Sequence, residues 1–171
     1  GKLIKGGKGG ANTNKTGLLF ERETSLETAL VDAGFQVVAG EILQDSKKLG
    51  LLMEKTKLYK FLEGNDVDWK KIVSTRLLPD EAVFSYSSNS LTVVEKKWQE
   101  VSGSVDEKLQ TSGFKLRQYR NLFEPLGANV KYIYLLNDWF AHPRYRDVLE
   151  YIRESGADYH FKSLPLDLLD L

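Results

Sequence analysis

The sequence predicts an α/β fold in which helices flank a mixed central β-sheet. Apolar residues recur at helical spacing in some stretches and form short β-rich runs in others, so helices and strands follow one another. A hairpin, a long helical stretch and a buried strand come in the order of a parallel crossover. The chain has 171 residues, of which 42% are apolar, and it contains no linker or repeat. We therefore expect residues 1–171 to form a single domain with its own core.

The first half of the chain is predicted to contain a helix, a strand and an insertion. Thr16 is the expected N-cap of a helix with leucines on one face, and Gly34 ends it. Residues 35–39 are predicted to form a short strand. Residues 41–77 are rich in lysine and are predicted to form a helical insertion with a break near Gly64, a candidate contact for DNA or for a second subunit.

The second half is predicted to supply the centre of the sheet. Four residues with turn chemistry, Ser87 to Ser90, separate two β-rich runs and predict a hairpin. The C-terminal end is predicted to be short and irregular. In order, the predicted elements are strands 82–86 and 91–98, helix 106–123, strand 130–136 and helix 144–154.

Basic and acidic residues balance at 24 each, which argues against a strongly basic protein that coats nucleic acid non-specifically. Their distribution is uneven, with basic blocks early in the chain and an acidic C-terminal end. This pattern suits a protein that contacts phosphates on one side, although ordinary solvated surface gives the same pattern. Residues 1–15 contain four lysines, no acid and two glycine pairs, and we expect a flexible basic arm in which Lys8 and Lys15 contact DNA.

The residue inventory also limits the chemistry. The chain has no cysteine and two histidines, which excludes disulfides, a thiol nucleophile and a zinc-finger site. Any metal must be held mainly by carboxylates, which favours Mg²⁺. No apolar run is long enough to span a membrane and no signal peptide is recognisable, so we expect a soluble, cytoplasmic protein without a membrane partner.

Two carboxylates and a lysine are predicted to meet at the open end of the hairpin. Side chains alternate along a strand, so Glu95 and Lys97 point to one face. Pairing Tyr86 with Leu91 across the turn places Asp80 opposite Lys97 and diagonal to Glu95. Two carboxylates can fix a divalent cation against a phosphate oxygen, and a lysine can balance charge that develops on phosphorus. The alternative is a surface ion-pair cluster.

Pro79-Asp80, a short hairpin and then Glu95-x-Lys97 at the end of an apolar strand resemble the PD-(D/E)XK nuclease superfamily. The order of elements over residues 16–136 is similar too. The resemblance implies a restriction-endonuclease-like core, with Asp80 and Glu95 as ligands of Mg²⁺ and Lys97 as the catalytic lysine. Members of the family commonly add a glutamate from the first helix. Glu23 is the preferred candidate because it lies on the leucine stripe of the predicted helix, and Glu21 stays an alternative.

Small and polar residues after the motif are predicted to contact DNA. Two serines beside a glycine can approach a phosphate closely, and the crossover helix mixes basic and amide side chains that suit phosphate and base contacts. For each of these residues singly, a solvated surface is the competing interpretation. The predicted DNA contacts in this region are Gln99, Ser102, Ser104, Lys108, Gln110, Lys115, Arg117 and Gln118.

Residues 95–122 resemble small type II restriction endonucleases, which have similar Glu-Lys-Lys and Asp-Glu-Lys-Leu-Gln stretches. The resemblance implies a Mg²⁺-dependent endonuclease that cuts duplex DNA at a specific sequence and leaves a 5′-phosphate. A palindromic target would imply a symmetric homodimer. Two alternatives stay open: a Holliday junction resolvase or repair nuclease of the same fold, and a non-catalytic DNA-binding protein.

Overall fold

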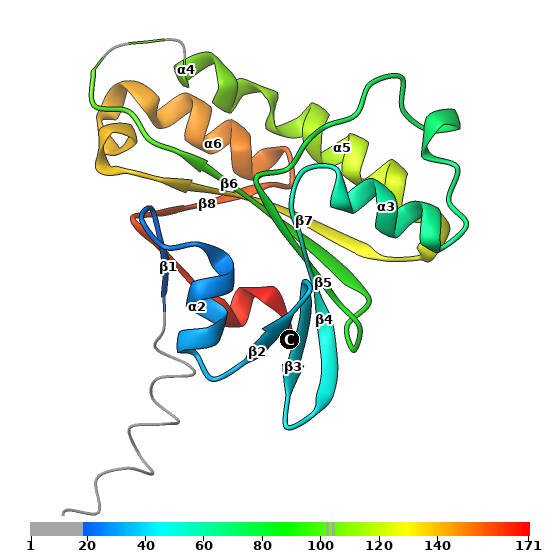
Figure 1. Ribbon diagram of the computed structural model, residues 1–171. Helices are drawn as coiled ribbons and strands as arrows, with labels where there is room; N and C mark the ends of the chain where they lie inside the picture. The colour runs from blue at the N-terminus through cyan, green and yellow to red at the C-terminus, as the bar shows by residue number, and fades with distance from the viewer. Residues whose placement is uncertain (1–18, 102, 104) are drawn as a thin grey trace, which may run out of the picture.

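A seven-stranded mixed sheet forms the centre of the protein, in a computed structural model that describes residues 19–101, 103 and 105–171 (Figure 1). The strand order is β2-β3-β4-β5-β6-β7-β8, and β1 pairs with β9 in a separate two-stranded sheet. This architecture confirms the predicted α/β class with helices on a mixed sheet. The strands are β1 (Leu19–Glu21), β2 (Gln36–Val38), β3 (Glu41–Gln44), β4 (Lys47–Met53), β5 (Glu81–Ser85), β6 (Ser90–Lys97), β7 (Asn129–Leu136), β8 (Asp158–Phe161) and β9 (Ser163–Pro165).

The described residues also form five α-helices and six short 3-10 turns. The α-helices are α2 (Leu26–Asp32), α3 (Lys57–Gly64), α4 (Val105–Lys108), α5 (Ser112–Phe123) and α6 (Arg146–Glu154). The 3-10 turns are η1 (Trp69–Lys71), η2 (Leu109–Thr111), η3 (Glu124–Leu126), η4 (Asp138–Ala141), η5 (Pro143–Tyr145) and η6 (Leu166–Leu169).

The pairing changes direction at the middle of the sheet. Neighbouring strands from β2 to β6 are antiparallel, whereas β7 runs parallel to both β6 and β8. The segment α4–α5 is the crossover from β6 to β7, as the sequence predicts. Its helix is interrupted by η2, so the predicted continuous helix 106–123 is two helices joined by a 3-10 turn.

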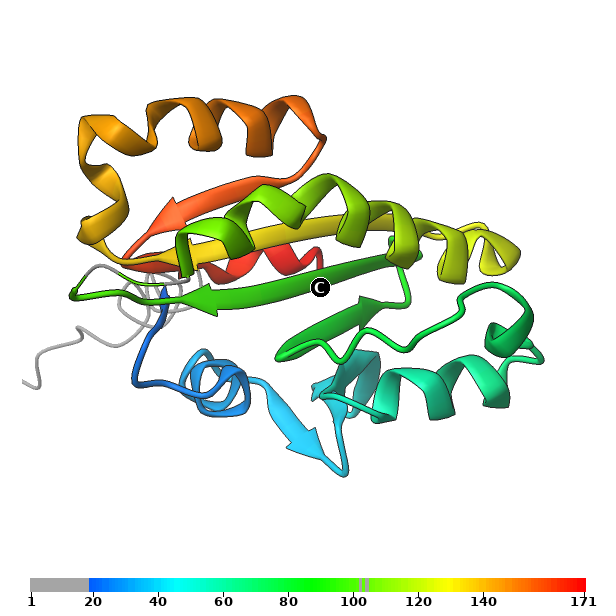
Figure 2. The same cartoon turned by 90° about the horizontal axis from the view of Figure 1, so that it is seen from above.

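Each face of the sheet has its own apolar core. Val93 and Tyr132 belong to the core under α3, α5 and α6, whereas Val94 and Ile133 belong to the core under α2 and the C-terminal segment. Figure 1 shows these two layers on opposite sides of the sheet, and Figure 2 shows α5 between α6 and α3. Because side chains alternate along β6, its consecutive polar residues at 95, 96 and 97 also face alternate layers.

The N-terminal part differs from the prediction. Within the described residues, the expected helix begins only at Leu26, where the Ser25 hydroxyl caps it by accepting a hydrogen bond from Thr28 N at 3.0 Å. The residues before it form β1, which pairs with β9 from the far end of the chain. Because β1 and β9 lie so far apart in the sequence, no pattern in the neighbouring residues predicts their pairing. The predicted N-cap at Thr16 lies outside the described residues.

The insertion and the C-terminal end differ too. Residues 41–53 form the β3–β4 hairpin rather than helix, with Asp45 and Ser46 at positive φ in its turn. Only α3 and η1 within residues 41–77 are helical, and α3 ends at Gly64, where a break is predicted. The C-terminal residues form β8, β9 and η6 instead of an irregular end. The predictions of a strand near 35–39, of the 82–98 hairpin, of the 130–136 strand and of a helix to Glu154 are confirmed within a few residues.

Candidate active site

The register of β5 and β6 brings Asp80 and Glu95 directly opposite each other. Glu81 pairs with Val94, so the next position outward on β5 faces Glu95. The predicted register, with Tyr86 opposite Leu91, is wrong by two residues because the turn closes at Ser85 and Ser90. A shift of two residues keeps every side chain on its face. The predicted cluster therefore forms, with the two carboxylates opposite rather than diagonal.

Three polar contacts connect the cluster. The backbone N–H of Asp80 donates to Glu95 Oε1 at 3.4 Å, and Lys97 Nζ lies 3.9 Å from Glu95 Oε2. On the other side, Lys55 Nζ lies 2.7 Å from Asp80 Oδ1. Met53 pairs with Ala82, so Lys55 continues β4 to the position opposite Asp80. A row of charged residues thus crosses the ends of three neighbouring strands.

A pocket of about 190 Å³ opens over this row. Asp80, Glu95 and Lys97 line it from the sheet, and Lys115 and Tyr119 line it from α5. The other lining residues are Leu77 and Leu78. A larger cavity of about 610 Å³ lies between η2, η5 and α6 and includes Gln110 and Asp106. The motif side chains line the smaller pocket, so donor chemistry rather than volume identifies the candidate site.

The environment shifts the pKa values of the two carboxyl groups in opposite directions. Burial raises the pKa of Glu95 to about 7, and the neighbouring Asp80 contributes to this rise. Burial also opposes ionisation of Asp80, but hydrogen bonds from Lys55 and Glu95 and the charge of Lys97 lower its pKa below the usual value. Glu95 is only 6% exposed. The pair therefore holds one proton at slightly acidic pH, on the Glu95 side.

These carboxylates suit a hard divalent cation. Two acidic oxygen donors face one another at the mouth of a polar pocket, without a histidine or sulfur ligand beside them. Within the described ranges, no group of three or more His, Cys, Asp or Glu side chains is close enough to hold a metal ion. Asp80 and Glu95 would accordingly share a cation with water and phosphate oxygens, the usual arrangement for Mg²⁺.

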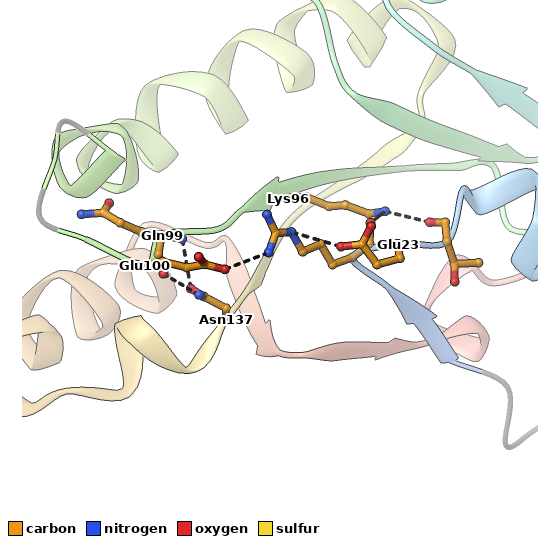
Figure 3. A network of polar contacts seen from close by, with 7 residues as sticks. Glu23, Lys96, Gln99, Glu100 and Asn137 are labelled. Atoms are coloured by element: carbon orange, nitrogen blue, oxygen red, sulfur yellow. Dashed lines mark hydrogen bonds and ion pairs between the residues drawn. The ribbon is translucent and has the colours of Figure 1, made fainter.

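The opposite face of the same strands anchors the N-terminal segment. Glu81 Oε2 accepts a hydrogen bond from Leu26 N at 2.8 Å, at the start of α2. Lys96 Nζ donates to the carbonyls of Arg22 and Thr24 at 2.9 and 2.7 Å (Figure 3). Burial raises the pKa of Glu81 to about 7. Glu81 and Lys96 thus fix the backs of the two strands whose front faces carry the candidate site.

The structure does not bring either N-terminal glutamate to Asp80 and Glu95. Glu21 lies in β1 and is exposed. Glu23 lies in the turn before α2 with an 89% exposed side chain, where it pairs with Arg22 at 3.5 Å (Figure 3). The leucine stripe predicted a continuous helix through this region, and the strand β1 removes that premise.

The predicted DNA contacts are distributed over several surfaces. Lys115 is the member that lines the pocket. Burial lowers the pKa of Lys115, and the charge of Glu95 partly offsets this effect. Lys8, Lys15, Ser102 and Ser104 lie outside the described residues. Lys108 and Gln110 are exposed in α4 and η2, and Arg117 and Gln118 lie on α5 away from the pocket lining.

Gln99 is buried rather than displayed on the surface. Its residue is 6% exposed, and its amide atoms find no hydrogen-bond partner among the described residues. Its backbone N–H donates to Asn137 Oδ1 at 3.2 Å, and Asn137 Nδ2 donates to its carbonyl at 2.5 Å (Figure 3). These bonds tie the chain beyond β6 to the chain beyond β7.

Sequence reasoning missed Lys55 and Glu81. Lys55 could be found only by recognising 47–53 as a strand beside β5, because the register then places it opposite Asp80. The signal for Glu81 is alternation itself, since a carboxylate next to Asp80 in a strand must face the opposite core. Tyr119, which also lines the pocket, is buried, and burial raises the pKa of its hydroxyl.

Comparison with protein families matches residues 12–112 to the PD-(D/E)XK nuclease superfamily domain. No curated protein and no solved structure matches the chain. Among the described helices, none has the length and apolar character needed to cross a membrane. The matched region contains Asp80, Glu95 and Lys97 and more than half of the 171 residues. The chain belongs to the PD-(D/E)XK nuclease superfamily.

Proposed function

We propose that this protein is a Mg²⁺-dependent endonuclease that hydrolyses phosphodiester bonds of duplex DNA. The observation that carries the proposal is the facing pair Asp80 and Glu95, with Lys97 3.9 Å from Glu95. Both residues lie in the region that matches a nuclease superfamily, and both line a small polar pocket. A surface ion-pair cluster accounts less well for it, because such a cluster gives no reason to bury Glu95 until its pKa reaches about 7.

Each charged residue that lines the pocket has a proposed task. Asp80 and Glu95 hold the cation, and Lys97 balances negative charge on the attacked phosphate or orients the attacking water. When bound, Mg²⁺ supplies positive charge to a phosphate oxygen and lowers the pKa of a water molecule. Lys115 approaches the same space from α5 and is proposed to contact the phosphate. Water attacks phosphorus in line and releases a proton to solvent while the bond from phosphorus to the 3′ oxygen breaks. The 3′ oxygen takes a proton from solvent, so that a 5′-phosphate and a 3′-hydroxyl remain.

The finer proposal is a type II restriction endonuclease that acts as a homodimer on a specific sequence. Its support is the resemblance of residues 95–122 to small restriction enzymes. A neutral net charge is compatible with such an enzyme, because base contacts supply part of its discrimination.

Incubation with phage DNA in Mg²⁺ or in EDTA tests both levels of the proposal. Discrete fragments that require Mg²⁺ are the expected result. A Mg²⁺-dependent smear would keep the nuclease and remove sequence specificity, and cleavage confined to branched DNA would favour a junction resolvase. Intact linear and branched DNA in Mg²⁺ would contradict nuclease activity and favour a non-catalytic DNA-binding protein.

A further inference from the structure

An aromatic–cation cluster lies beside the candidate active site, formed by Tyr59, Trp69, Lys70 and Arg76. The rings of Tyr59 and Trp69 meet edge to face with 4.9 Å between their centres. Arg76 Cζ lies 5.7 Å from the centre of the Trp69 ring and 5.8 Å from that of Tyr59. Lys70 Nζ lies 5.6 Å from the Trp69 ring centre. Two cations therefore share one indole ring.

The cluster is tied to the segment that carries Asp80. The Tyr59 hydroxyl donates a 2.6 Å hydrogen bond to the carbonyl of Leu77, and Tyr59 is almost completely buried. Leu77 and Leu78 in turn line the pocket with Asp80. Arg76 and Asp80 are four positions apart in the chain, a reach of at most about 14 Å. A DNA strand has one phosphate per roughly 3.4 Å of helix axis, so this reach covers a few phosphates.

The two cations lack carboxylate partners among the described residues, although acids lie nearby. Glu63 accepts the indole N–H of Trp69 at 2.9 Å, and Asp68 lies 3.8 Å from Lys71. No ion pair within the described ranges involves Lys70 or Arg76. Two unpaired cations on one ring repel each other, and an anion that contacts both removes this penalty.

The chemistry of Arg76 favours phosphate as that anion. The guanidinium Cζ lies 5.8 and 5.7 Å from the two ring centres, so the rings help to hold the charge in place, and a guanidinium can bond phosphate through two N–H groups at once. A contact of this type carries no base information and instead fixes the register of a strand. A symmetric interface that placed this cluster against its own copy would bring like charges together, which disfavours that arrangement.

We propose that the aromatic–cation cluster binds the phosphate backbone of duplex DNA a few nucleotides from the scissile phosphate. This inference rests on the proposed nuclease function and assigns part of the 41–77 segment to the DNA. The strand would pass from the cluster, along residues 77–79, into the pocket. Arg76 would hold one phosphate and Lys70 the same phosphate or its neighbour.

The test is binding of a labelled duplex by the full chain in EDTA, measured by fluorescence anisotropy over a series of salt concentrations. Arg76→Ala is expected to weaken binding about tenfold at low salt. It is also expected to reduce the slope of log affinity against log salt by about 0.9, the value for one lost phosphate contact. Lys70→Ala is expected to act in the same direction. Lys47→Ala, which removes an exposed lysine from the start of β4, is the matched control and should leave the slope unchanged.

Arg76→Lys is a second variant that does not depend on loss of charge. It keeps the positive charge at this position but lacks the guanidinium group that can bond phosphate through two N–H groups. It should keep the salt slope while lowering affinity several-fold, with an unchanged melting temperature. Affinity and slope equal to wild type in both alanine variants would overturn the inference. So would a change in sedimentation of Arg76→Ala with unaltered DNA binding, which would mark a subunit contact. Cleavage by the wild type in Mg²⁺ is a separate readout, so failure of the cluster and failure of the nuclease proposal are distinguishable.

Discussion

Lys55 Nζ lies 2.7 Å from Oδ1 of Asp80, one of the two carboxylates that are proposed to hold the cation. The lysine lowers the pKa of Asp80 and also opposes a divalent cation by its charge. At pH 8 the Asp80 carboxylate is ionised whether or not Lys55 lowers its pKa. The repulsion between Lys55 and the cation therefore decides the effect of Lys55 on cation affinity.

Lys55→Met is therefore predicted to bind Mg²⁺ several-fold more tightly at pH 8, an effect of about 1 kcal/mol for an exposed charge. Isothermal titration calorimetry of the wild type and the variant measures this, and Lys60→Met is the control from the exposed face of α3. Weaker binding in Lys55→Met would show instead that the lysine is needed to position Asp80.

Cation binding is predicted to strengthen as pH rises through about 7. Below that pH, Glu95 holds a proton that the cation must displace, because burial and Asp80 raise its pKa to about 7. We expect about tenfold tighter Mg²⁺ binding at pH 8 than at pH 6, with proton release near pH 6.5. Titrations in two buffers of different ionisation enthalpy detect the released proton. Equal affinity at both pH values would contradict the assignment of Glu95 as a ligand.

Glu81→Gln is predicted to stabilise the metal-free protein at high pH only. The pKa of Glu81 is raised from 4.5 to about 7, so its favourable contribution is complete below pH 4.5 and is lost as pH rises through 7. Glutamine keeps an acceptor for Leu26 N without a charge to bury. We expect the free energy of unfolding to rise by about 1 kcal/mol at pH 8 and to change little at pH 4.5.

Urea unfolding at the two pH values measures this difference. Glu150→Gln, at an exposed position of α6, controls for loss of a surface charge. If Glu81→Gln is less stable than the wild type at pH 8, the hydrogen bond from Leu26 N to the Glu81 carboxylate stabilises the fold by more than the burial of its charge costs.

Lys115→Met is predicted to reduce cleavage by about 10- to 100-fold and to move the rising limb of the pH–rate profile to higher pH. The first effect follows from loss of a cation that faces the phosphate. The second follows because the charge of Lys115 lowers the pKa of Glu95. If Lys115 had only a structural role, the rising limb of the pH–rate profile would stay at the same pH. Arg120→Met, at an exposed position of α5 that does not line the pocket, should change neither quantity.

Local patterns predicted the centre of this fold and failed at its periphery. Ser87 to Ser90 marked the hairpin, and alternation assigned Glu95 and Lys97 to one face, so the cluster could be found despite a register wrong by two residues. The β3–β4 hairpin resisted prediction because Lys47–Met53 has lysines and leucines whose spacing fits a helix as well as a strand. The pairing of β1 with β9 joins the two ends of the described chain, so no local signal reports it.

The same limit applies to the site. Asp80, Glu95 and Lys97 lie on consecutive strands of one hairpin, where sequence spacing determines distance. Lys55 enters from a third strand and depends on a pairing that local spacing does not encode. Glu23 was assigned from a helix that begins three residues after it, and the change of element moved its side chain away from the carboxylate pair.

Cleavage of duplex DNA in Mg²⁺ by the wild type and by Asp80→Ala tests the central claim most directly. Asp32→Ala, at the exposed end of α2, is the matched control, and unfolding curves verify that all three proteins fold. We predict cleavage by the wild type and Asp32→Ala, and a loss of at least about a thousandfold in Asp80→Ala. Equal cleavage by a folded Asp80→Ala variant would contradict the account.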